Sequence, residues 1–181
     1  SELSFKHDAD GATSLLEMQV RKLRDEQSRL MDMLSGFVST GKENEELFFK
    51  SKNLTLSLIT SKNFDEVKKT VESFFEKNFE IDSCILEALS DPELQELESK
   101  TGLGMSKDVI HMGPLSKEKI DAFFSSDSVK SAVISVMKLK KGFALLKMGS
   151  NEPTKYLGDG DTTFIEYIRD IIVRVLELKE A

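Results

Sequence analysis

The chain has 181 residues, of which 39% are apolar and 31% charged, with a formal net charge of −7. This composition is typical of one globular domain with an extension, and the acidic balance argues against a nucleic-acid-binding protein, which needs a basic surface. No run approaches the roughly 20 apolar residues of a membrane span, no signal segment opens the chain, and the single cysteine, Cys84, excludes an internal disulfide framework. We therefore expect a cytoplasmic protein that binds neither membranes nor nucleic acid.

The N-terminal third of the chain carries a long helix pattern. Residues 1–12 show no period and are predicted to be flexible, whereas residues 13–60 are predicted to form a helical, coiled-coil segment. Ser14 and Glu17 have the spacing of a capping box at its start. The glycines of Gly36–Gly41 interrupt the pattern and indicate a bend, after which the helix continues.

One row of residues in this segment follows a spacing of alternately four and three positions, which is the heptad spacing of a coiled coil. The row consists of Leu16, Val20, Leu23, Gln27, Leu30, Leu34 and Phe37. Gln27 occupies a central a position, where a polar side chain helps to fix register and strand number. We therefore expect a homodimer interface along this row. The alternative is a single amphipathic helix that lies on its own domain.

The remaining residues, 61–181, alternate between helix and strand patterns and are predicted to form one domain. Predicted helices cover residues 62–79, 91–102, 114–126 and 163–180, and predicted strands cover 80–89, 108–113 and two runs within 129–150. Asn63 and Glu66 form a cap pair, and Gly142 supplies the tight turn between the last two strands. This order predicts an α+β fold in which helices flank an antiparallel sheet.

The last predicted helix carries more apolar residues than contact with one sheet requires. One face carries Phe164, Ile168, Ile171, Val175 and Leu178, and Ile165, Ile172 and Leu176 widen it. From this widened face we select Ile168, Ile172 and Val175 as candidate interface residues. Since an apolar face of this width calls for a second contact, we expect these three residues to contact another subunit.

The glycine-rich stretch Lys147–Ile168 raises the question of a phosphate or metal loop. Its segment GDGDTT has no lysine at the position that a phosphate-binding loop requires, and Asp159 and Asp161 would repel phosphate. Its acidic residues also lack the spacing of a calcium loop. The preferred interpretation is a turn followed by a helix N-cap at Asp161 or Thr162.

Several stretches resemble the bacterial domain-of-unknown-function family 484. They are Val20–Leu30, Lys42–Phe48, Ser131–Leu139, Gly149–Tyr156 and Gly160–Ile165. The likeness departs from the family at residues 160–162, where Gly-Asp-Thr stands in place of the expected Met-Gly-Thr. The resemblance implies a GAF-like fold with a helical N-terminal segment, a six-stranded antiparallel sheet and dimerisation through terminal helices. It implies no activity, although GAF-like domains in general bind small molecules between the sheet and its covering loops.

A set of methionines and aromatic residues around one histidine forms the candidate ligand pocket, with ordinary core packing as the alternative. The set is Met105, His111, Met112, Phe123, Phe124, Met137 and Met148. No metal site is predicted, because two distant histidines and Cys84 make a poor ligand set. Cys84 lies among apolar residues and is predicted to be a buried, unreactive thiol.

Lysines gather around the predicted hairpin. They are Lys138, Lys140, Lys141 and Lys147. We interpret them as a solvated sheet edge that blocks aggregation, with an acidic ligand or partner as the alternative.

These patterns, together with the resemblance, favour a non-enzymatic, GAF-like sensory or regulatory domain that works in signalling as a homodimer and binds a small molecule of unknown identity. No set of acidic, histidine or cysteine residues has a spacing that indicates catalysis. The alternative function is a ligand-free scaffold that uses the same helices to hold another protein.

Overall fold

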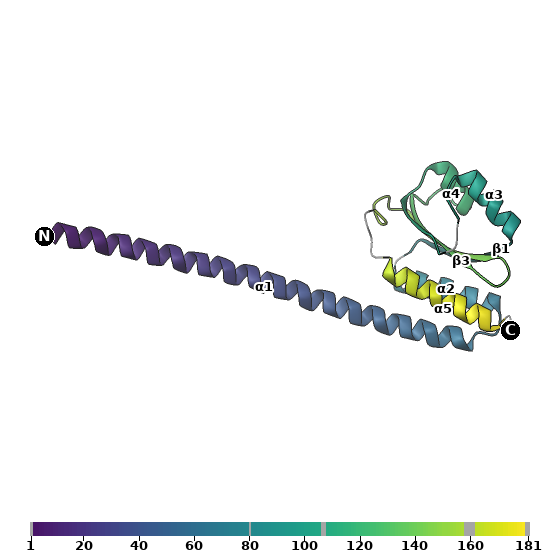
Figure 1. Ribbon diagram of the computed structural model, residues 1–181, viewed down its shortest axis with the longest axis horizontal. Coiled ribbons are helices and arrows are strands. Elements are labelled where there is room, and N and C mark those ends of the chain that lie inside the picture. The colour runs from purple at the N-terminus through teal and green to yellow at the C-terminus, as the bar shows by residue number, and fades with distance from the viewer. Residues whose placement is uncertain (1, 80, 106–107, 158–161, 180–181) are drawn as a thin grey trace. The chain divides into compact units, whose positions relative to one another are not determined.

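The computed structural model describes residues 2–79, 81–105, 108–157 and 162–179, with side chains from Leu15 onward. The chain divides into two compact units, Ser1–Phe49 and Lys50–Ala181. A single helix, α1 (Glu2–Thr60), supplies the first unit and the first residues of the second (Figure 1).

Helix α1 is longer and more regular than the sequence pattern predicted. It begins at Glu2, so the predicted helix start at Ser14 is wrong, and it continues through the segment 36–41 where a bend was expected. A serine and a glutamate three positions apart can also lie within a helix, and each isolated glycine costs a helix only about 1 kcal/mol. The better helix formers on either side of this segment, at residues 29–34 and 42–47, compensate for that cost.

The second unit contains a four-stranded antiparallel sheet. Its strands are β1 (Ser83–Leu89), β2 (Ile110–Pro114), β3 (Ser131–Lys138) and β4 (Phe143–Ser150), in the order β1-β4-β3-β2. The α+β prediction is confirmed. The resemblance implied six strands, whereas the sheet of the described residues has four; the loops around it form turns and do not add further strands there.

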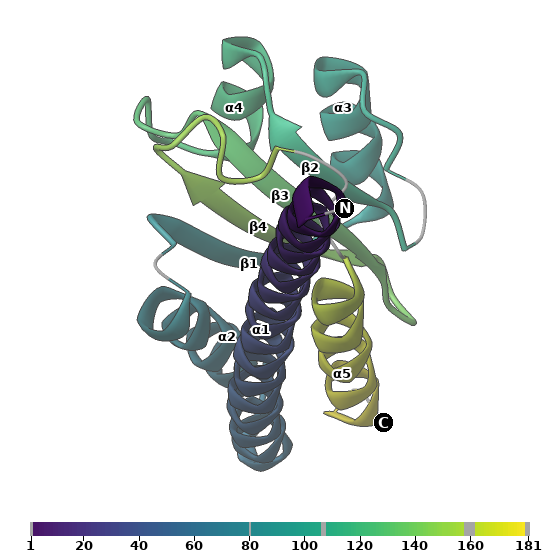
Figure 2. The ribbon, with the colours of Figure 1, turned by 90° about the vertical axis from the view of Figure 1, so that its left-hand side faces the viewer.

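Helices cover both faces of this sheet. They are α2 (Phe64–Asn78), α3 (Asp91–Thr101), α4 (Lys117–Phe123) and α5 (Thr163–Lys179). Helices α2 and α5 lie on one face, and α3 and α4 lie on the other (Figures 1 and 2). Because both faces are covered, β3 and β4 are buried at nearly every position instead of alternating between buried and exposed residues.

The two faces carry two separate hydrophobic cores. The α2/α5 core contains Phe75, Met137 and Ile172, together with Leu54 and Leu58 from the last turns of α1. The opposite core, under α3 and α4, contains residues such as Leu94, Phe123, Ile134 and Leu145. Neighbouring residues of one strand enter different cores, because successive side chains of a strand point to opposite faces.

Local capping signals set the helix boundaries. Asn63 Oδ1 accepts a hydrogen bond from the Glu66 amide at 2.9 Å, and Glu66 Oε2 accepts one from the Lys62 amide at 2.8 Å. Helix α3 has Pro92 in its first turn and ends at Gly102, whose φ of 64° is left-handed. These boundaries were predicted from sequence and are confirmed.

One amide on the outer edge of β1 is bonded to a side chain of α2. The amide of Leu86 donates a hydrogen bond of 2.9 Å to Glu72 Oε1. The opposite edge strand, β2, is short and ends at Pro114.

The turn between β3 and β4 depends on Gly142, as its sequence predicted. Its φ is 73°, and a Cβ built there would lie 2.5 Å from the carbonyl oxygen of Leu89. We expect Gly142→Ala to lower the free energy of unfolding of the second unit by about 1 to 3 kcal/mol, because strain and steric overlap coincide. Urea unfolding followed by circular dichroism measures this. The matched control is Gly104→Ala, whose Cβ would meet its nearest atom at 4.0 Å; equal effects of the two substitutions would contradict the prediction.

Candidate functional site

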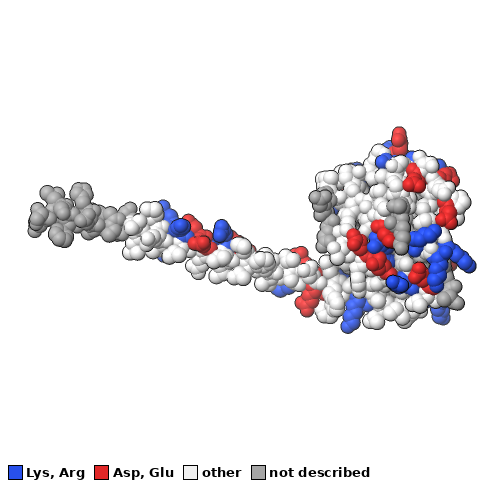
Figure 3. Space-filling model, viewed as in Figure 1, with Lys and Arg blue, Asp and Glu red and all other residues white. Residues whose placement is uncertain are grey.

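The predicted heptad row forms an exposed apolar stripe on α1. We call its seven residues, Leu16, Val20, Leu23, Gln27, Leu30, Leu34 and Phe37, the α1 seam. All of them are exposed, and the six apolar ones range from 39% for Val20 to 69% for Phe37. Figure 3 shows long uncharged stretches between the charged groups of α1. Contiguous exposed apolar surface is typical of interaction sites, so the α1 seam is the candidate interaction surface.

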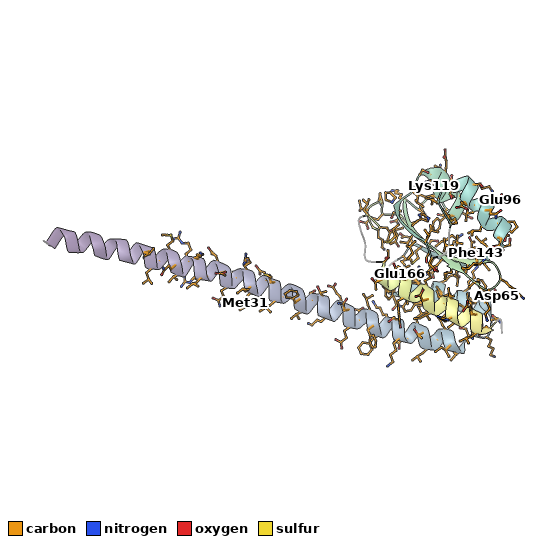
Figure 4. The ribbon with its side chains drawn as sticks, viewed as in Figure 1. Met31, Asp65, Glu96, Lys119, Phe143 and Glu166 are labelled. Atoms are coloured by element: carbon orange, nitrogen blue, oxygen red, sulfur yellow. The ribbon has the colours of Figure 1, made fainter. Side chains whose placement is uncertain are left out.

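The stripe widens toward its C-terminal end. Met31 and Val38 occupy e positions and Met33 occupies a g position, and all three are more than half exposed. Figure 4 shows Met31 projecting from the helix. The corresponding flanking positions nearer the N-terminus are polar, with Arg24 at e and Glu26 at g.

The residues of α5 that were expected at a subunit interface lie inside the second unit. Ile168 and Ile172 are fully buried, and Val175 is 6% exposed, all within the α2/α5 core. Their apolar excess is therefore satisfied by the sheet, α2 and the end of α1. The expectation that these three residues contact another subunit is corrected accordingly.

Six of the seven residues of the candidate ligand pocket are divided between the two cores. Met137 and Met148 are buried in the α2/α5 core, against which Met112 packs, and Met105, Phe123 and Phe124 are buried in the opposite core. His111 Nε2 lies 2.8 Å from the carbonyl oxygen of Gly104. The sheet separates the two groups, so these residues do not line one cavity.

Lys147 is a buried cation that the sequence placed at a solvated edge. It is 5% exposed, and its Nζ donates to the Phe123 carbonyl at 2.8 Å and lies 2.7 Å from Glu87 Oε1. Strand alternation turns Lys147 toward α4, where the charge is compensated by its two partners. One sequence signal could have indicated this burial. Lys147 follows the apolar run of residues 143–146, in a strand that is buried at nearly every position.

Two of the other lysines near the hairpin, the half-buried Lys138 and the exposed Lys140, also have partners. Lys138 Nζ lies 3.4 Å from Asp91 Oδ1 and 4.0 Å from the centre of the Phe143 ring, labelled in Figure 4. Lys140 Nζ donates to the Glu177 carbonyl at 3.2 Å.

The stretch after β4 is held by hydrogen bonds, in agreement with a turn. Asp82 Oδ2 accepts from the Asn151 amide at 2.8 Å and from Ser150 Oγ at 3.0 Å. Asp159 and Asp161 lie outside the described residues. Helix α5 begins directly after Thr162, whose hydroxyl donates to Glu166 Oε1 at 2.6 Å.

These contacts predict a pH-dependent contribution from Asp82. The Asn151 amide and the Ser150 hydroxyl lower the pKa of Asp82, because both stabilise the carboxylate. The stabilisation is present above the pKa of the unfolded chain and is lost as the pH falls through the lowered folded pKa. We therefore expect Asp82→Asn to lower the free energy of unfolding at pH 7. The difference in this free energy between the variant and the unsubstituted protein is expected to shrink below about pH 4.

Urea midpoints at several pH values measure this difference between Asp82→Asn and the unsubstituted protein. Asp121→Asn, at an exposed position of α4, is the control. A difference for Asp82→Asn that stays constant down to acidic pH would contradict the prediction.

An open groove runs between the last turns of α1 and α2. It has a volume of about 610 Å³ and is lined by Lys50, Asn53, Leu54, Ser57, Lys69, Thr70, Ser73, Phe74, Lys77 and Asn78. Three of these residues are lysines and none is acidic. Lys50 Nζ donates to the Asn78 carbonyl at 3.3 Å, which ties α1 to α2 beside the groove.

The described residues hold no group of three or more histidine, cysteine or acidic side chains that could bind a metal ion. The Cys84 thiol is buried, and desolvation raises its pKa, so the reactive thiolate is disfavoured. Within the same described part of the chain, no helix is both long and apolar enough to cross a membrane.

Comparison with known proteins agrees with the motifs. No curated protein matches the chain. The model of one family, DUF484, described as a protein of unknown function, matches residues 1–179. Since this match spans almost the entire sequence, the chain belongs to the DUF484 family.

Proposed function

We propose that the protein is a non-enzymatic regulatory module that works as a homodimer joined by the α1 seam. The observation that carries the proposal is the exposed heptad row on α1. Burial of a leucine-sized side chain contributes about 1.5 to 3 kcal/mol, so a second copy that covers the seam would gain substantial stabilisation. A heptad row is self-complementary, because each seam residue of one helix fits between four residues of the other.

The sensory part of the proposal concerns a small anionic ligand in the groove between α1 and α2. Lys50, Lys69 and Lys77 supply positive charge there, while Leu54 and Phe74 supply apolar surface. The groove is built partly from α1, the helix that also carries the seam. A ligand would act as a signal only if it bound two arrangements of α1 with different affinity.

The alternative is a ligand-free scaffold that uses α1 to hold other proteins. The division of six of the seven candidate pocket residues between two packed cores favours this alternative over a ligand buried within the sheet domain. In both versions the chain performs no catalysis of its own.

Sedimentation velocity over the micromolar range and native mass spectrometry of protein purified under mild conditions test the proposal. A dimer with an added small mass supports the sensory module. A bare dimer favours the scaffold. A monomer at all concentrations overturns the homodimer.

A further inference from the structure

We infer that the second copy pairs with α1 in parallel and in register, so that Gln27 faces the partner's Gln27. This inference rests on the homodimer proposed above and adds its direction. It follows from the one polar residue of the α1 seam and from the flanking residues where the stripe widens.

Gln27 is the residue whose environment differs most between the two directions. In a parallel, in-register pair, a positions face a positions, so the amide of Gln27 can donate to and accept from the partner's Gln27. In an antiparallel pair, a positions face d positions, and every d residue of the seam is apolar.

The two antiparallel registers that pair most of the seam place Gln27 opposite the partner's Leu30 or the partner's Leu23. Its amide would then be covered without a hydrogen-bond partner in either copy. An unsatisfied buried polar group costs about 1 to 3 kcal/mol, and this cost would occur twice in the dimer. The seam therefore favours the parallel direction.

The flanking positions support the same direction. In a parallel pair, a g residue lies beside the next e residue of the other helix, which joins Met33 to the partner's Val38 on both sides of the seam. Met33 and Val38 are 51% and 57% exposed in the single chain, so this pairing covers apolar surface. In an antiparallel pair, g residues face g residues, and Met33 would lie beside the partner's Glu26 or the partner's Gln19.

Parallel pairing has a consequence for the dimer as a whole. The C-terminal ends of both α1 helices come to the same end of the coiled coil. In both copies the Lys50–Ala181 unit begins in this part of α1, so the two units are connected to the same end of the coiled coil.

Disulfide trapping in the full-length chain tests the direction. A disulfide requires Cβ atoms within about 4.5 Å, so it forms only between facing positions. Val20→Cys is expected to give a dimer linked through two identical positions under mild oxidation. The two antiparallel registers are tested by co-expressing Val20→Cys chains with Phe37→Cys chains, or with Leu30→Cys chains. Intact mass shows whether a linked dimer contains two different variants, a mixed pair, or two copies of one variant, an identical pair.

Two controls make the outcome specific. Arg29→Cys lies off the seam and is expected to form disulfides at least roughly tenfold more slowly, because it lacks the high effective concentration of facing residues. The unsubstituted chain, whose sole cysteine is buried, is expected to form none.

Linked Val20→Cys dimers without mixed pairs support the parallel arrangement. If sedimentation shows a dimer while only mixed pairs form, the parallel direction is overturned and the homodimer stands. If sedimentation shows a monomer and no position links, the homodimer and the direction both fall.

Discussion

Leu23→Glu is expected to convert the proposed homodimer into monomers. Leu23 is a central d residue of the α1 seam and is 66% exposed in the single chain. Each dimer loses two buried leucines, worth about 1.5 to 3 kcal/mol each, and brings two like charges together in the seam. We therefore expect the dissociation constant to rise by about 10² to 10⁴-fold. Sedimentation equilibrium of the full-length chain measures it directly.

The matched control for this variant is Met18→Glu. Met18 is 60% exposed, a fraction similar to the 66% of Leu23, but it lies on the opposite side of α1 from the seam. It is expected to leave the dissociation constant unchanged within about threefold, in line with an ordinary surface substitution. Similar association for both glutamate variants would show that the seam is not the interface.

Glu87→Ala is expected to lower the free energy of unfolding of the second unit by about 2 to 4 kcal/mol. The substitution removes the carboxylate 2.7 Å from Lys147 Nζ and leaves a buried ammonium with the Phe123 carbonyl. Breaking one side of a buried ion pair is costly, because the remaining charge stays desolvated. Partial exposure of Glu87 places the effect toward the lower part of this range. Urea unfolding measures it.

A second substitution separates this cause from a general loss of packing. In Glu87→Ala/Lys147→Met the buried charge is gone, so the double variant is expected to be more stable than Glu87→Ala alone. Glu96→Ala removes a carboxylate 2.6 Å from Lys100 Nζ in an exposed pair on α3, and its expected cost is below about 1 kcal/mol. A Glu87→Ala cost no larger than that of Glu96→Ala would contradict the assignment.

Local signals in the sequence predicted most of the element boundaries. Asn63 with Glu66, Pro92 with Gly102, and Gly142 each act within a few residues, so their roles follow from spacing alone. The α1 seam was found for the same reason, because a heptad row is a local repeat.

The properties that the sequence did not predict depend on residues far apart in the chain. Lys147 is buried because α4 brings the Phe123 carbonyl over the sheet, and nothing near Lys147 in the sequence indicates that contact. Ile168 and Ile172 share their core with Leu54 and Leu58, which lie more than 100 residues earlier in the chain. The sequence does not show that these leucines cover α5, so the apolar face of α5 was assigned to a subunit interface. The grouping of the candidate pocket residues in one cavity was wrong for a similar reason. The sequence does not show on which face of the sheet each of these side chains lies.

The contact between Glu72 and the Leu86 amide has a consequence for how the protein avoids aggregation. An exposed edge strand offers unpaired amides and carbonyls to strands of other molecules. On β1 a carboxylate of α2 already accepts from one of these amides, and on β2 a short strand ends at a proline, which has no amide hydrogen to donate. Growth of the sheet by strand addition is therefore discouraged at both edges. Association through a helix such as α1 does not extend the sheet.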